Sequence, residues 1–280
     1  MNPLGLRWTI GDVSSRGFEA LRLSIWGAQA AFGGEIRMAV VVNSLDVEEA
    51  KSRTGDVPSQ VEWLPAGGPP DVLTDFLDKD MAEGVAWKLA PLRVFPDIHE
   101  LSLDNDCILW SIPPAISAWI EEEEPRCLIA ADVKLALGAF TQFTRPEPRN
   151  TGIRGLPPHH DLAAAFARVL AEHPTKLRSE LDEQGLQALA FDLDRRAHVV
   201  PTEDVSICSP FWPHQQNLGR HGAHFVGLNA HRLPWSHYDR PASEWVAEHW
   251  DAHRPELYRR VGLGFPAANG SLPSANDLRI

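Results

Sequence analysis

Residues 101–110, with the sequence LSLDNDCILW, place three polar side chains inside an apolar run that is typical of a buried strand. Asp104, Asn105 and Asp106 interrupt the run, which resumes at Cys107. Burying two carboxylates is costly unless a cation or hydrogen bonds compensate them. The chain at this point is therefore expected either to turn out to solvent or to hold a metal ion.

The segments before this stretch alternate between strand-like and helix-like patterns. Residues 6–12 and 35–43 are apolar and rich in residues that favour strands. Residues 17–34 between them have the spacing of an amphipathic helix, and they end in two glycines that can terminate one. This order predicts a βαβ unit, which requires two parallel strands joined by a helix.

The same alternation continues through the rest of the chain and predicts an α/β fold. Further strands are expected at 61–65, 99–103, 107–110, 127–131, 197–201 and 223–228. Further helices are expected at 82–95, from Pro113 onward, at 161–174 and at 180–191. Residues 243–262 also look helical, although Pro255 should break or restart that helix. The expected architecture is a central, mostly parallel mixed sheet flanked by helices.

The chain is expected to form a single domain over residues 1–280. A hydrophobic content of 44% in 280 residues is enough for a substantial core. Neither an internal repeat nor a long linker interrupts the pattern. The expected division is a core of about residues 6–240 with a helical extension over 241–280.

Charge and cysteine content restrict the classes of partner and the compartment. A formal net charge of −12 disfavours nucleic acid and anionic membranes as partners. Three separated cysteines, Cys107, Cys127 and Cys208, argue against a disulfide framework or a zinc ribbon. The sequence contains neither an apolar run long enough to span a membrane nor a recognisable export leader. These features predict a protein of the cytoplasm.

The Asp-x-Asp triplet becomes a stronger metal candidate in its context. Ligands of open parallel sheets collect at the carboxyl ends of strands, and Asp104 to Asp106 follow an expected strand. Carboxylate oxygens suit Mg²⁺ and Mn²⁺, and an added imidazole favours Mn²⁺. His224 could supply the imidazole from the distant stretch HGAHFVGLNAHRLPW, where Gly227 would allow close approach of the backbone. The predicted metal ligands are Asp104, Asp106 and His224.

An Asp-x-Asp at a strand end, followed far downstream by His-Phe-x-Gly and a basic residue before Pro-Trp, resembles the family-8 retaining glycosyltransferases, which include glycogenin and bacterial lipopolysaccharide galactosyl- and glucosyltransferases. Other segments occur in the family's order. Residues 9–26 are similar to its opening strand, base-binding loop and helix. Residues 149–157 are similar to its Asn-Ala/Ser-Gly segment, and 181–189 to its Asp-Gln-Gly-Leu segment.

The resemblance implies a GT-A fold and a metal-dependent transfer of a hexose from a nucleotide diphosphate sugar, with retention of configuration. The implied cofactor is Mn²⁺, with Mg²⁺ as an alternative. The implied donor is first of all a uridine diphosphate sugar, and the acceptor is a saccharide or another hydroxyl compound. The residues implied to bind the donor are Thr9, Asp12, Lys88, Asn150, Gly227 and Arg232.

On the catalytic side the resemblance points to Gln184 together with Asp182 or Glu183. The choice between the two acids stays open because the family's Asp-Gln pair reads here as Glu183-Gln184. The stretch from His224 to Trp235 is also longer than the family's motif, so either His231 or Arg232 could take the basic role at the phosphates.

Simpler interpretations stand beside these roles. Acids such as Asp182 and Glu183 commonly cap or begin helices, and His224 could be a hydrogen-bonded core histidine. His159, His160 and Asp161 look like a helix entry rather than a second metal site. Two other functions also fit the pattern: a non-catalytic nucleotide- or sugar-binding protein on the same fold, and a metal-dependent phosphohydrolase.

Overall fold

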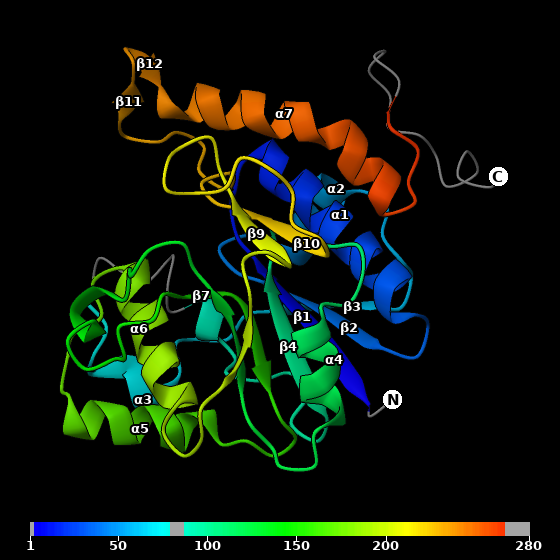
Figure 1. The fold of residues 1–280 in the computed structure, drawn as a ribbon. Helices are drawn as coiled ribbons and strands as arrows, with labels where there is room; N and C mark the ends of the chain where they lie inside the picture. Colours follow the sequence, from blue (N-terminus) through cyan, green and yellow to red (C-terminus); the bar gives the residue numbers. More distant parts are fainter. Residues whose placement is uncertain (1–2, 79–86, 267–280) are drawn as a thin grey trace.

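The computed structural model describes residues 3–78 and 87–266, and within them a central seven-stranded sheet (Figure 1). Its strands are β1 Leu4–Ile10, β2 Arg37–Val42, β3 Val61–Pro65, β4 His99–Asp104, β6 Leu128–Ala131, β7 Arg149–Leu156 and β8 His198–Val200. Their order across the sheet is β3-β2-β1-β4-β7-β6-β8. Strand β7 runs antiparallel to both neighbours, and the other pairings are parallel. The predicted mostly parallel, mixed sheet is confirmed.

Helices cover both faces of this sheet (Figure 1). They are α1 Ser15–Phe32, α2 Val47–Thr54, α3 Asp71–Thr74, α4 Pro114–Glu121, α5 Leu162–Glu172, α6 Glu180–Phe191 and α7 Ala242–Arg260, with short 3₁₀ turns at Trp87–Leu89 and Gly138–Phe140. Apolar side chains of α1 and α4 pack with Trp8 of β1 and Leu101 of β4. Those of α3, α5 and α6 pack with Ile129 of β6 and Leu156 of β7 in a second cluster. The sheet therefore separates two apolar cores.

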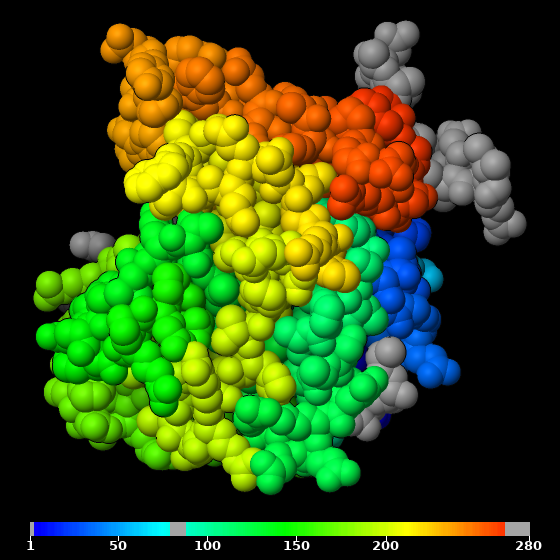
Figure 2. Space-filling model, in the orientation of Figure 1, coloured from blue at the N-terminus to red at the C-terminus, as the bar shows by residue number. Residues whose placement is uncertain are grey.

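A second, three-stranded sheet lies beside the central one and supports the long C-terminal helix. It contains β5 Cys107–Leu109, β9 Val205–Cys208 and β10 Gly222–Phe225, in the order β5-β10-β9. A short ribbon of β11 Ser236–His237 and β12 Arg240–Pro241 leads into α7. Figure 2 shows α7 (orange) lying along one edge of the molecule, directly against the segment around β9 and β10 (yellow). Apolar residues of α7, including Val246 and Trp250, join Phe225 in a third cluster.

Two helix predictions were wrong. Residues 82–95 were expected to be helical, but residues 79–86 lie outside the described part, and after the 3₁₀ turn at Trp87–Leu89 the chain continues as a loop. Pro91 disfavours the helical conformation at the residue before it and supplies no backbone donor, and no packed helix continues past it here. Pro255 was expected to break or restart the last helix, yet α7 runs through it from Ala242 to Arg260. The helix therefore tolerates one missing backbone hydrogen bond, while Trp250 and Leu257 on either side of Pro255 stay buried in the third cluster.

Helix entries follow from local side-chain hydrogen bonds. The Ser14 hydroxyl accepts from the backbone N–H of Gly17 at the start of α1. Asp161 accepts from the backbone N–H of Ala164 at the start of α5, which confirms the interpretation of residues 159–161 as a helix entry. Each cap satisfies a backbone donor that the first turn of a helix leaves unpaired.

Candidate metal and donor site

The Asp-x-Asp triplet lies at the carboxyl end of β4, as the sequence pattern predicted. Asp104 is the last residue of β4, and Asn105 and Asp106 form the turn that leads into β5. Asp104 pairs in register with Thr9 near the end of β1, which is parallel to β4. The turn therefore lies where the parallel strands of the sheet end and their loops converge.

Strand β10 brings His224 to the two carboxylates. Its Nε2 lies 3.3 Å from Asp106 Oδ1 and 3.6 Å from Asp104 Oδ2. One potential ligand atom from each of the three residues falls within 4.8 Å of the others. Asp106 Oδ1 is buried and has no hydrogen-bond partner among the described residues. Two carboxylates and an imidazole form a donor set that suits a divalent cation. A buried carboxylate oxygen without a hydrogen-bond partner is a further sign of such a site.

The charges around Asp104 and Asp106 favour a positively charged group beside the two carboxylates. Burial alone would raise the pKa of Asp104, but the charges of Lys88 and His224 outweigh it, and the pKa lies below its usual value. Burial would likewise lower the pKa of His224, but Asp106 and Asp104 raise it above its usual value. Lys88 and His224 thus favour the ionised form of Asp104, and the two carboxylates favour the protonated form of His224.

Lys88 reaches this site because two buried arginines hold its backbone. Arg7 and Arg154 both donate to the carbonyl oxygen of Lys88, at 3.2 Å and 2.8 Å. Arg7 is completely buried and is paired with the equally buried Glu100 at 3.7 Å. The Lys88 ammonium then lies 2.7 Å from Asp104 Oδ1 and donates to the Thr151 hydroxyl at 3.1 Å. The 3₁₀ turn thus presents one cation to the metal-ligand candidates.

Asn229, in the loop after β10, fixes the orientation of the acidic turn. Its Nδ2 donates to Asp106 Oδ2 at 3.1 Å and to Asn105 Oδ1 at 3.0 Å. In return Asn105 donates to Asn229 Oδ1 at 2.6 Å and to the carbonyl oxygen of Gly17 at 3.1 Å. The side chain of the middle residue of the triplet is therefore bonded to Asn229 and Gly17.

Asn150 and Gln184 lie beside the same cluster with most of their polar atoms in use. Asn150 donates to Asp132 at 3.1 Å and accepts from the backbone N–H of Gly152 at 2.7 Å. Gln184 accepts from the backbone N–H of Thr151 at 3.1 Å and donates to the carbonyl oxygen of Ala136 at 2.9 Å. These bonds fix both side chains in place at the wall of the site.

The two acids at the start of α6 have different surroundings. Asp182 accepts from the backbone N–H groups of Ala139 and Arg178, both at 2.8 Å, so its carboxylate joins the helix start to the 3₁₀ turn at Gly138–Phe140. Glu183 is completely buried, and it accepts a hydrogen bond from Gln187. Burial raises the pKa of Glu183, against the lowering effect of Lys88 and Arg154. Of these two acids, Glu183 is the one that faces the site.

The remaining predicted donor residues are spread over a wider area. Thr9 and Asp12 line a cleft next to Asp104, and Asp12 is held by Arg53 at 2.8 Å with His231 Nε2 at 3.4 Å. Gly227 lines the cleft on the other side of the metal-ligand candidates. Arg232 is exposed and lines a separate cleft. The structure therefore brings His231, rather than Arg232, beside Asp12.

Two clefts meet at the acidic turn. The first cleft extends from the turn towards the ends of β1 and β2, and its lining includes Thr9, Asp12, Asn43, Ser44, Asn105 and Arg154. The second cleft extends towards β10 and the loop before α7, and its lining includes Asp106, Asn150, Gln184, Phe211, His224 and Trp235. Residues common to both are Lys88, Asp104, Glu180, Glu183 and Asn229. The acidic turn therefore lies at the junction of two open spaces.

Some residues of the site were not found by sequence reasoning. Asn229 lies in the quoted stretch 221–235 but carries no charge and matches no motif, so only its contact with Asp106 reveals it. Arg154 and Arg7 occur inside strand patterns, where a buried cation is not expected. Their role in holding Lys88 depends on tertiary contacts between distant segments.

No family model and no curated protein sequence matches the chain. Similarity appears instead in the comparison with solved structures. The galactosyltransferase LgtC, solved in complex with donor and acceptor sugar analogs, is 13% identical, with a TM-score of 0.54 over 92% of this chain and 99% of LgtC. Mouse xyloside xylosyltransferase 1 is 12% identical, with a TM-score of 0.52 over 80% of this chain and 96% of its own.

The bifunctional glycosyltransferase WbbM is 14% identical, with a TM-score of 0.51 over 92% of this chain. The match spans 52% of WbbM. All three similarities cover at least 80% of this chain. They confirm the predicted GT-A fold, with its mixed sheet between layers of helices.

Among the described residues, the structure contains no helix with the length and apolar character needed to cross a bilayer.

Proposed function

We propose that this chain is a metal-dependent hexosyltransferase that uses a nucleotide diphosphate sugar, in the first instance a uridine diphosphate sugar. The observation that carries the proposal is the arrangement of Asp104, Asp106 and His224 at the junction of two clefts, with the Asp106 Oδ1 atom buried and unpaired among the described residues. The GT-A fold, common to LgtC, which was solved with donor and acceptor sugar analogs, supports it.

The residues fit a divalent cation. The donor set of two carboxylates and one imidazole is hard enough for Mg²⁺ and, with its nitrogen, suits Mn²⁺. A bound cation would neutralise negative charge that grows on the diphosphate as it leaves. Asp104, Asp106 and His224 would hold it, with the His224 imidazole bound in its neutral form.

The two clefts offer separate places for the parts of the substrates. The first cleft would take the base and ribose, with Thr9 and Asp12 near them. The second cleft would take the transferred hexose, close to Asn150 and Gln184, and an acceptor sugar. Phe211 and the partly exposed Trp235 in its wall could stack on a sugar ring.

Lys88 and Glu183 would act directly at the reacting groups. The Lys88 ammonium lies at the junction of the clefts, where it would contact the diphosphate and stabilise its charge. Glu183 and Gln184, which line the second cleft, would lie beside the sugar carbon that develops positive charge. Asp182 would hold the start of α6 in place through its backbone contacts.

Retention of configuration would follow from attack on the face that the diphosphate leaves. The bond between the sugar carbon and the phosphate oxygen breaks while the bond to the acceptor oxygen forms on the same side. The acceptor proton passes to the departing phosphate oxygen, so that the protein need not supply a separate general base.

A second candidate is a non-catalytic binding protein on the same fold. The observation in its favour is that both polar atoms of the Gln184 side chain already bind backbone groups, which leaves less capacity to act on a sugar. This candidate predicts donor binding without turnover.

The test combines binding and turnover in wild type, Asp106→Asn and the exposed control Asp97→Asn. Thermal-shift titrations would use nucleoside diphosphates with and without Mn²⁺, since a ligand of the folded state raises the melting temperature by mass action. We expect one nucleotide to stabilise wild type and Asp97→Asn only with Mn²⁺, and to lose its effect in Asp106→Asn. Transfer from the matching nucleotide sugar to a saccharide would then be lost in the same variant.

Other outcomes separate the alternatives. Mn²⁺-dependent binding without turnover of any nucleotide sugar would favour the non-catalytic binding protein. Release of phosphate or nucleotide at a rate independent of every acceptor would favour a phosphohydrolase. Equal nucleotide binding by wild type and Asp106→Asn, or none by either, would contradict the proposed metal and donor site.

A further inference from the structure

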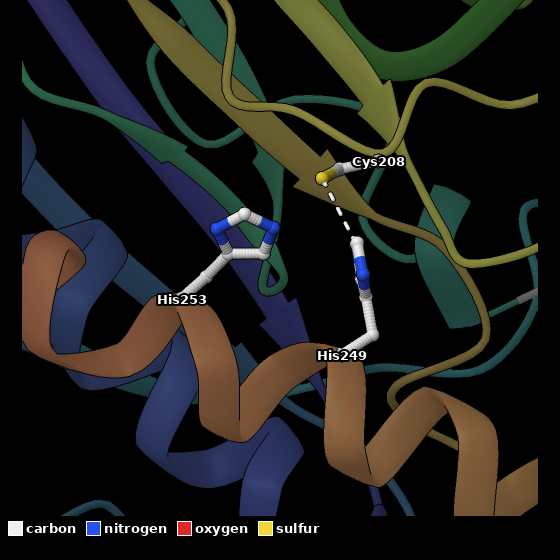
Figure 3. A group of neighbouring side chains, drawn as sticks. All are labelled: Cys208, His249 and His253. Carbon is white, nitrogen blue, oxygen red and sulfur yellow. Dashed lines mark hydrogen bonds between the residues drawn. The ribbon is translucent and has the colours of Figure 1, made fainter.

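A second group of metal-ligating side chains lies between β9 and α7. Cys208 is the last residue of β9, and His249 and His253 lie one turn apart on α7 (Figure 3). Cys208 Sγ lies 3.3 Å from His249 Nε2, and one potential ligand atom from each residue falls within 4.8 Å of the others. Both imidazoles point from the helix towards the thiol (Figure 3).

The spacing of these atoms fits a tetrahedral zinc site. Zinc binds sulfur and nitrogen at about 2.0–2.3 Å, so two ligands of a tetrahedral ion lie about 3.3–3.8 Å apart. The Cys208 to His249 distance of 3.3 Å already meets this requirement. Two histidines four residues apart face the same side of a helix and form a common zinc-binding pair.

Neighbouring groups orient the three side chains. His253 Nε2 lies 2.9 Å from the carbonyl oxygen of Gln216, and this contact orients the ring. Phe225 packs against both imidazoles, with ring centroids 6.2 Å from His249 and 6.0 Å from His253. The three side chains are therefore packed between strand β9 and helix α7.

The surroundings do not suit a nucleophilic cysteine. Burial raises the pKa of Cys208 to about 12, so the thiol carries little thiolate without a metal. Burial and the neighbouring His253 lower the pKa of His249 to about 4, so this imidazole is neutral at physiological pH. A neutral imidazole has a free lone pair for a metal, but it does not stabilise a thiolate as an imidazolium would.

We propose that Cys208, His249 and His253 bind a zinc ion that fastens α7 to the three-stranded sheet. Three protein ligands leave one tetrahedral position for water. Cys208 pairs in register with Phe225, the residue after His224, so the ion would hold the end of the strand that carries His224. The site is separate from Asp104 and Asp106, and its existence does not depend on the proposed transferase activity.

Cobalt substitution tests the site through a signal that only a thiolate ligand gives. The chelator-treated protein would be titrated with Co²⁺ and its near-ultraviolet absorption recorded. We expect a thiolate-to-cobalt charge-transfer band in wild type and in Asp106→Asn, because the first site has no sulfur. The band should disappear in Cys208→Ser. It should persist in the control Cys127→Ser, because Cys127 is a buried cysteine that lies beside a single histidine, His160.

Zinc affinity gives the second measurement. Competition of Zn²⁺ against bound Co²⁺ should show binding at least about tenfold weaker in His249→Gln and His253→Gln, since even outer-shell losses cost that much. Both histidines are partly exposed, so these variants keep the test informative if Cys208→Ser fails to fold. No charge-transfer band in wild type, a band that persists in Cys208→Ser, or unchanged zinc affinity in both histidine variants would overturn the proposal and leave a thiol–imidazole hydrogen bond.

Discussion

Asn229 Nδ2 donates to Asp106 Oδ2 at 3.1 Å, across 123 residues of sequence. The same amide group is paired twice with Asn105, the middle residue of the acidic triplet. One uncharged side chain thus connects the loop that follows His224 with the turn that carries Asp106. The unpaired Oδ1 of Asp106 is left facing His224 because its other oxygen is already bound.

Replacing Asn229 with alanine should destabilise the protein by about 2 kcal/mol, because the change leaves buried polar groups of Asn105 and Asp106 without partners. Urea denaturation would measure the loss. The control is Asn217→Ala at an exposed position, for which we expect a change within about 0.5 kcal/mol. Equal stability of the two variants would show that the Asn105–Asn229 pairing contributes nothing to the fold.

Replacing Lys88 with methionine should keep the length of the side chain and remove its charge. Lys88 and Asp104 are 20% and 25% exposed, so their 2.7 Å ion pair is only partly screened by solvent, and we expect a loss of about 2 kcal/mol. If the chain acts as proposed, donor turnover should also fall about 10²-fold, as when one group that stabilises developing charge is removed.

Lys51→Met is the matched control for this change, since Lys51 is paired with the largely exposed Glu48. An exposed pair contributes little, and a change within about 0.5 kcal/mol is expected. A Lys88→Met variant as stable and active as Lys51→Met would rule out a role for the Lys88 charge.

Gly227 adopts a φ of 87°, a left-handed conformation that side chains rarely adopt. Alanine at this position would have room, with the nearest atoms 3.8 Å from its Cβ, so the cost should be the backbone strain of about 1–2 kcal/mol. Gly34 also has open space and no positive φ, and Gly34→Ala should be neutral or slightly stabilising. Denaturation midpoints that move equally in both variants would contradict the strain argument.

Much of the fold follows from local patterns in the sequence. The helix α6 occupies residues 180–191 as predicted, because its apolar spacing and the Ser179 cap are both local. The order of parallel strands, by contrast, is fixed by packing between distant segments. Strands β5 and β10 were predicted as ordinary buried strands and β9 was not predicted, and only their pairing shows that the three form a second sheet.

The residues of the candidate site also fall into those that the sequence reveals and those that only the folded structure reveals. Asp104 and Asp106 could be placed from sequence, because a polar interruption directly after an apolar strand is a local feature. The contacts of Asn229, Arg7 and Arg154 could not, because they depend on side chains that meet only in the folded chain. Cys208 was missed as a ligand candidate for the same reason, since its partners lie about forty residues downstream on α7.

Glu183 should make the stability of the protein depend on pH. Its pKa is raised in the folded state, chiefly by burial, so the unfolded chain ionises first as the pH rises. Stability is therefore lost as the pH rises from the ordinary glutamate pKa of about 4.5 through the raised folded value. Glu183→Gln removes this loss and can still accept the hydrogen bond from Gln187.

We accordingly expect Glu183→Gln to melt at a higher temperature than wild type at pH 8, with a difference that shrinks towards pH 4.5. Glu180→Gln, an exposed change in the same first turn, should lower the melting temperature slightly at pH 8, because an acid near a helix N-terminus is mildly stabilising. Melting curves of the three proteins between pH 4.5 and pH 8 would measure both effects. A difference between wild type and Glu183→Gln that stays constant across this range would show that ionisation of Glu183 does not oppose folding.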